Sequence, residues 1–124
     1  MDWEPITIDE LFQRIRASEE KLRSELSRFW NLIQICPTKW QEQSYGEVGG
    51  GFWAVGIIGE YVIWFNDIED GFNISRYREY GRIHEYWCNQ DELHVSVERL
   101  YSLIRYGGNL TGQAGPPESL EFED

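Results

Sequence analysis

The chain has 124 residues, a length that predicts a single domain with a hydrophobic core of its own. Its formal charge of −11 argues against nucleic acid and anionic membrane surfaces as direct partners, because both are bound by basic patches. No apolar run approaches the roughly 20 residues that a membrane span needs, and no secretory signal is evident. We therefore expect a cytoplasmic protein in which Cys36 and Cys88 are reduced, buried thiols.

The first predicted element is a long amphipathic helix. Thr7 and Glu10 form a capping box, in which each side chain can bond the main-chain amide of the other residue. Apolar residues then recur at helical spacing as far as residue 33, and Pro37 ends the helix by about residue 35. Such a helix of about 27 residues would be about 40 Å long and could lie across a whole small sheet. A break near residues 17–18 is the alternative.

An antiparallel meander is predicted in the middle of the chain. β-Branched and aromatic residues form two runs, at 52–58 and 61–66. Gly59 and Glu60 between them form a Gly-X pair, which is typical of a two-residue type II′ hairpin. Residues 39–43 could supply an irregular strand before these two.

The meander continues beyond a polar corner at residues 66–71, which ends in the turn signal Asp-Gly. A third strand is predicted at about 72–77 and a fourth at about 82–88. The third strand alternates apolar and polar residues, and Arg76 at its end indicates a sheet edge or a solvated end.

A second helix is predicted to begin at Asn89, its capping residue, with Glu92 three positions later, and to end at Gly107. Residues 107–124 are rich in Gly, Pro and acidic residues and contain no basic residue, so we expect a flexible tail. The prediction is one α+β domain at 1–106. Its long N-terminal helix packs on an antiparallel meander of four or so strands, and a C-terminal helix follows.

The two central runs are apolar on both faces, whereas a sheet covered on one side shows clean alternation. We therefore expect that both faces of these strands are covered. The cover could be the rest of the chain, a pocket, or a second copy of the protein in a homodimer.

The acidic corner is the first candidate site. Asp67, Glu69 and Asp70 place three carboxylates within four residues. They could line a protein-binding face or hold a cation, although the spacing does not match an EF-hand loop. The alternative is a solvated turn whose Asn and Asp side chains bond the main chain.

The aromatic residues are the second candidate. Trp53, Trp64, Tyr77 and Trp87 could line an apolar ligand pocket in a curled sheet, or they could simply form the core. His84 and His94 lack further ligands at metal-binding spacing, so we expect no metal site and no cofactor.

The string at residues 63–75, together with the Cys-Asn-Gln-Asp-Glu-Leu run at 88–93, resembles a group of short bacterial proteins of unknown function. The resemblance covers about residues 37–105 and implies no activity for any residue. In size, acidity and element order the chain also resembles toxin-immunity proteins. The order of a long helix and a curled antiparallel sheet resembles cystatin-like domains, which include both binders and enzymes.

The function we expect is non-catalytic protein binding of the immunity type. The negative charge predicts a basic partner, because charge of this size steers oppositely charged molecules. The alternative is a small-molecule-binding or enzymatic domain that uses the aromatic pocket.

Overall fold

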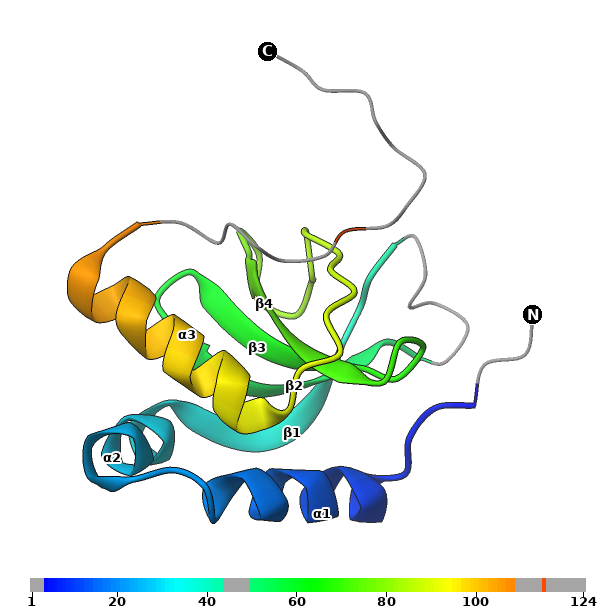
Figure 1. The fold of residues 1–124 in the computed structure, drawn as a ribbon. Helices are drawn as coiled ribbons and strands as arrows, with labels where there is room; N and C mark the ends of the chain where they lie inside the picture. Colours follow the sequence, from blue (N-terminus) through cyan, green and yellow to red (C-terminus); the bar gives the residue numbers. More distant parts are fainter. Residues whose placement is uncertain (1–3, 44–49, 109–114, 116–124) are drawn as a thin grey trace.

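The structure is a computed structural model that describes residues 4–43, 50–108 and 115. Two N-terminal helices precede a four-stranded antiparallel meander with strand order β1-β2-β3-β4, and a C-terminal helix packs on the sheet (Figure 1). This confirms the predicted α+β class. The elements are α1 (Ile8–Glu19), α2 (Ser24–Ile33), β1 (Gln34–Trp40), β2 (Phe52–Ile58), β3 (Tyr61–Asn66), β4 (Gly71–Arg76) and α3 (Leu93–Tyr106).

The predicted long helix is divided into α1 and α2. The capping box at Thr7 is confirmed, but α1 ends at Glu19, and Arg23 is the N-cap of α2. The break lets Trp30 Nε1 donate to Glu19 Oε2 at 2.8 Å, although these residues would stand about 16 Å apart along one straight helix. Strands of six or seven residues span only about 20–23 Å, so an unbroken helix would overhang the sheet.

The first strand begins earlier than predicted. β1 follows α2 directly at Gln34, whereas the sequence suggested a strand at residues 39–43. Pro37 lies within β1, where its missing N–H is tolerated because β1 is an edge strand and its pairing with β2 is irregular between Gln34 and Thr38.

The bounds of β2 and β3 agree with the predicted runs, and the turn between them has the expected two residues, with Gly59 at φ 58°. Ile58 pairs with Tyr61 across this hairpin. β4 covers residues 71–76 and forms the other edge, as its sequence indicated.

Both faces of the sheet are covered, as the two-sided apolar pattern predicted. On one face, the three helices and the sheet share a single core that includes Leu11, Trp30 and Leu100. On the far face, Trp40, Phe52, Ala54, Val62, Trp64 and Ile83 form a second cluster. The far face is covered by the chain itself, because Ile83 belongs to the segment that follows β4 and Tyr77 and Tyr86 of that segment pack against the cluster.

The segment at residues 77–92 is not the fourth strand that the sequence predicted at 82–88. Its only ladder contacts among the described residues are two isolated bridges, Gln41 with Arg82 and Phe72 with Asp91. We call residues 77–92 the cover segment. It crosses the far face as an irregular chain and therefore needs hydrogen-bond partners other than a neighbouring strand.

Those partners are three buried side chains of β3 and β4. Asn66, Asn73 and Ser75 are all at most 1% exposed. Asn66 Nδ2 donates to the carbonyl of residue 87, and Ser75 Oγ donates to that of residue 85. Asn73 binds Asn89 twice, because its Oδ1 accepts from the amide at 2.8 Å and its Nδ2 donates to the carbonyl at 3.2 Å. The alternating polar residues of β4 thus face the cover segment and not solvent.

The last helix begins three residues later than the prediction from Asn89. Its N-cap is Glu92, whose side chain makes no capping bond. Asn89 is held by Asn73 and so cannot cap α3. The helix stops at Gly107 as predicted, with φ 83° and a bond from its N–H to the carbonyl of Leu103.

Two other predictions concern the ends of the chain and the cysteines. The expected tail at 107–124 lies outside the described residues except for Gly107, Gly108 and Gly115, which are exposed. Both cysteines are free, but Cys36 is exposed on edge strand β1, so the expectation that both thiols are buried is wrong.

Candidate functional site

The acidic corner between β3 and β4 is a turn organised by Asn66. Its Oδ1 accepts from the amides of Ile68 and Glu69, and its carbonyl accepts from the amide of Asp70 at 2.7 Å. Asp70 has φ 66°, a left-handed conformation that Asp adopts more readily than most residues. The turn interpretation accounts for this local geometry.

Two of the three carboxylates of the corner bind partners in the N-terminal part of the chain. Asp67 Oδ2 accepts from the amide of Ile6 at 2.8 Å, which ties down the segment before α1. Asp70 forms an ion pair with Arg14 of α1 at 2.8 Å. Among the described residues, no group of three or more His, Cys, Asp or Glu side chains is placed to hold a metal ion.

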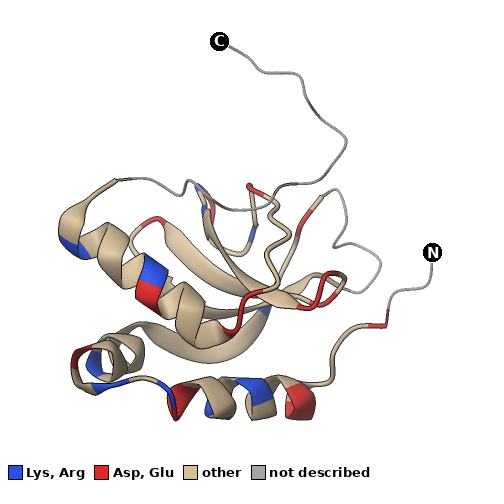
Figure 2. Ribbon diagram, viewed as in Figure 1, with Lys and Arg blue, Asp and Glu red and all other residues tan. Residues whose placement is uncertain are grey.

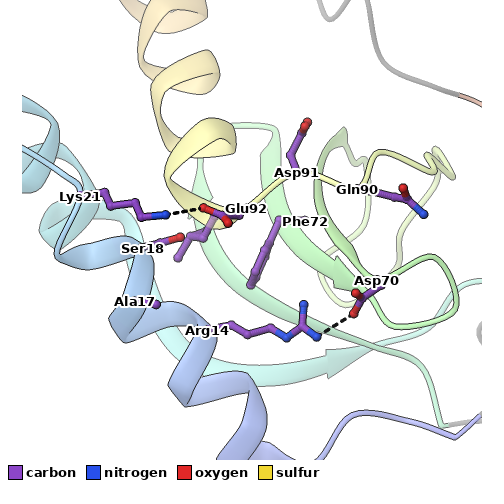
Figure 3. A pocket seen from close by; sticks show the side chains of 10 residues that line it. Arg14, Ala17, Ser18, Lys21, Asp70, Phe72, Gln90, Asp91 and Glu92 are labelled. Carbon is purple, nitrogen blue, oxygen red and sulfur yellow. Dashed lines mark hydrogen bonds and ion pairs between the residues drawn. The ribbon is translucent and has the colours of Figure 1, made fainter.

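A cleft of about 270 Å³ lies between α1, the corner and the start of α3 (Figure 3). Two exposed ion pairs cross it: Arg14 to Asp70, and Lys21 to Glu92 at 2.9 Å. The hydrogen bond and charge of Lys21 lower the pKa of Glu92 below its usual value. The lining residues are Arg14, Ala17, Ser18, Lys21, Asp70, Phe72, Gln90, Asp91, Glu92 and Leu93.

A second cleft of about 350 Å³ adjoins the first on the other side of the Arg14–Asp70 ion pair. Both clefts are lined by these two residues, and the second extends to Glu4, Glu10 and Asp67.

The two clefts therefore form one continuous surface, which we call the acidic edge. Its carboxylates come from the N-terminal segment and α1, the corner, and the start of α3 (Figure 2). Against them stand two cations, Arg14 and Lys21. Six carboxylates line the acidic edge, namely Glu4, Glu10, Asp67, Asp70, Asp91 and Glu92, and Glu69 lies in the same corner as Asp67 and Asp70.

A serine and a glutamate that line the first cleft lie close to a histidine, His94. Ser18 Oγ lies 3.3 Å from His94 Nδ1 and also accepts from the His94 amide at 3.1 Å. Glu92 Oε1 lies 3.4 Å from that same Nδ1. A catalytic triad uses opposite ring nitrogens for the nucleophile and the acid, so this arrangement is not a proton relay. Ser18 is 3% exposed and caps the N-terminus of α3 from outside the helix.

The aromatic candidates are distributed over both faces of the sheet. Trp53 is half-buried and packs against the helix-side core, and Lys39 Nζ lies 5.0 Å from its ring centroid. Trp64 is fully buried in the far-face cluster, where Tyr77 packs against Trp40. Rings on opposite faces do not line one cavity, so this arrangement gives the aromatic-pocket interpretation no support.

Trp87 lies apart from both clusters, in the cover segment. Its carbonyl is bound by Asn66 at the start of the corner, and its ring is half-buried.

The sequence drew attention to the corner but not to Arg14, Lys21, Asp91 or Glu92, which surround it in space. These residues are far from the corner in sequence, and each looks like an ordinary charge on a helix or at a helix start. Only the antiparallel turn and the packing of α1 beside α3 bring them together.

No protein-family model matches this chain, and the searches of curated proteins and of solved structures found no significant match. Within the described part of the chain, no helix is long and apolar enough to cross a membrane.

Proposed function

We propose that this chain is a non-catalytic protein-binding domain of the immunity type, and that it binds a basic partner protein through the acidic edge. One observation carries the proposal: three separate segments of the chain bring six carboxylates to one continuous surface that holds two cations. Fields from such grouped charges steer an oppositely charged protein toward the surface.

The carboxylates of the acidic edge could exchange their present cations for basic residues of a partner. Arg14 and Asp70 are 45% and 66% exposed, and an exposed pair contributes only about 0–1 kcal/mol. An arginine or lysine of the partner could therefore replace Arg14 beside Asp70 at small cost, and the released Arg14 would return to solvent.

The proposal includes the bacterial and cytoplasmic character that the sequence suggested. The two free cysteines support a reducing compartment, since paired cysteines are typical of oxidising ones. A homodimer is the alternative to a basic partner. The apolar far face that motivated it is covered by residues 77–92, so a different protein is the favoured partner.

The test is an affinity capture from the native host with matched charge variants. The first variant carries Glu69→Gln and Asp70→Asn in the corner. The control carries Glu60→Gln and Glu79→Gln, two exposed carboxylates near the opposite end of β3, and it changes the net charge equally. We expect the wild type and the control to retain one basic protein, such as a nuclease-like toxin, and the corner variant to lose it. Equal capture by both variants would refute the role of the acidic edge.

A further inference from the structure

The guanidinium of Arg14 lies where the two clefts of the acidic edge meet, and it has two kinds of partner there. Its Nη2 is 2.8 Å from Asp70 Oδ1, and its Cζ lies over the Phe65 ring, 5.1 Å from the ring centroid. Figure 3 shows the side chain extending from α1 toward Asp70 at the corner. A carboxylate and an aromatic face thus receive the same guanidinium.

The rest of the fold holds these two receiving groups in place. Phe65 is 1% exposed, and its ring packs on that of Phe72 with the centroids 4.8 Å apart. The amide of Asp70 donates to the carbonyl of Asn66 within the corner turn. None of these contacts involves Arg14, so the ring and the carboxylate are positioned for a guanidinium whether or not Arg14 supplies it.

Arg14 itself is held weakly. Its side chain is 45% exposed, and the second cleft, of about 350 Å³, opens beside it and is lined by Phe65. Exposed ion pairs and exposed cation–π contacts are both weak, because water competes for the cation. A second guanidinium that enters from solvent could therefore displace Arg14 from the same partners.

We propose that Phe65 and Asp70 form a guanidinium-binding site, that Arg14 occupies it as an internal ligand in the free protein, and that an arginine of the basic partner displaces Arg14. This inference rests on the proposed function, because it names the group of the partner that the acidic edge receives. Arginine fits this site better than lysine. A planar guanidinium can stack on a ring and donate two parallel hydrogen bonds to one carboxylate, whereas an ammonium is a compact and strongly hydrated charge.

The experiment is an NMR titration of the full chain with two probes, N-acetyl-arginine amide and N-acetyl-lysine amide. An internal ligand lowers the apparent affinity for a competing one, because the site is open for only a fraction of the time. We expect Arg14→Ala to bind the arginine probe about fivefold to tenfold more tightly than the wild type does. The largest shifts should be at the Asp70 amide and the Phe65 ring protons, at the same signals in both proteins.

Two further variants separate this site from the overall charge. Arg16→Ala removes an exposed arginine from the same helix and changes the net charge equally, so it should bind the arginine probe as the wild type does. Adding Asp70→Asn to Arg14→Ala should abolish the gain in affinity, since the carboxylate that receives the guanidinium is lost. The lysine probe should bind Arg14→Ala several-fold more weakly than the arginine probe does.

Two results would overturn the inference. One is equal affinity of Arg14→Ala and Arg16→Ala for the arginine probe, and the other is equal binding of the two probes by Arg14→Ala. Either result leaves the proposed function standing if the corner variant still loses the captured protein. An arginine preference combined with full capture by the corner variant would instead overturn the proposed function, and with it the assignment of this arginine to the partner.

Discussion

Asn73 is the residue on which the attachment of the cover segment depends most. It is 1% exposed, and it binds the amide and the carbonyl of Asn89 and also the carbonyl of Gly71, the last at 3.4 Å. Asn73→Ala removes all three bonds and leaves buried main-chain groups of the cover segment without that partner. At about 1 kcal/mol for each bond, with a further penalty for unsatisfied groups, we expect a loss of about 3 kcal/mol in the free energy of unfolding.

The assay is equilibrium unfolding in urea. With a slope of about 1–3 kcal/mol per molar urea, the midpoint should fall by about 1–3 M. The matched control is Asn31→Ala, which removes an exposed asparagine from α2 and should change the free energy by less than about 0.5 kcal/mol. If the two variants lost the same small amount, the cover segment would not be held in the way described here.

Three further predictions concern packing, capping and alkaline pH. Gly71→Ala should destabilise the fold by about 3 kcal/mol or more, because the added Cβ would lie 2.3 Å from main-chain atoms of the cover segment. Gly59→Ala should cost only about 1–2 kcal/mol, because Gly59 lies in open space and only its φ of 58° disfavours a side chain. Urea unfolding of the two variants measures both losses, and a larger loss for Gly59→Ala would contradict the packing described for Gly71. Ser18→Ala should cost about 1 kcal/mol and speed amide exchange at His94, since α3 loses its cap; unchanged exchange would exclude the capping role. Burial raises the pKa of Tyr86 above its usual value of 10.0. The stability that this shift adds to the folded state is therefore complete below pH 10, and it is lost as the pH rises above 10 because the unfolded chain ionises first. Unfolding at pH 9 and pH 11 should show a smaller loss for Tyr86→Phe than for the wild type, and equal losses would refute this.

Local signals in the sequence predicted the elements that depend on local chemistry. The capping box at Thr7, the hairpin at Gly59 and the helix stop at Gly107 each arise from residues within a few positions of one another. The two-sided apolar pattern of β2 and β3 also predicted that both faces would be covered, because a strand with one solvent-exposed face would alternate apolar and polar residues.

The sequence placed some elements wrongly because their positions depend on contacts between residues that are distant in sequence. In other places, side chains take the hydrogen bonds that a neighbouring strand would otherwise make. The break after α1 is supported by the bond from Trp30 to Glu19, which no helical periodicity reveals. The sequence of residues 82–88 is typical of a strand. In the structure, however, the side chains of Asn73 and Ser75 bind main-chain groups of the cover segment, which therefore needs no neighbouring strand as a partner. The acidic edge could be predicted only at its corner, because its other carboxylates are brought there by packing.

In the function we propose, the acidic edge steers a basic partner to this domain. The most direct measurement is the association rate constant between the chain and its captured partner, at low salt and at about 0.15 M salt, where the Debye length is about 8 Å. For the variant with Glu69→Gln and Asp70→Asn, we expect association several-fold slower than the wild type at low salt, with the difference shrinking at the higher salt. The Glu60→Gln, Glu79→Gln control should associate nearly as fast as the wild type. Association rates that are identical for the two variants at both salt concentrations would contradict the account.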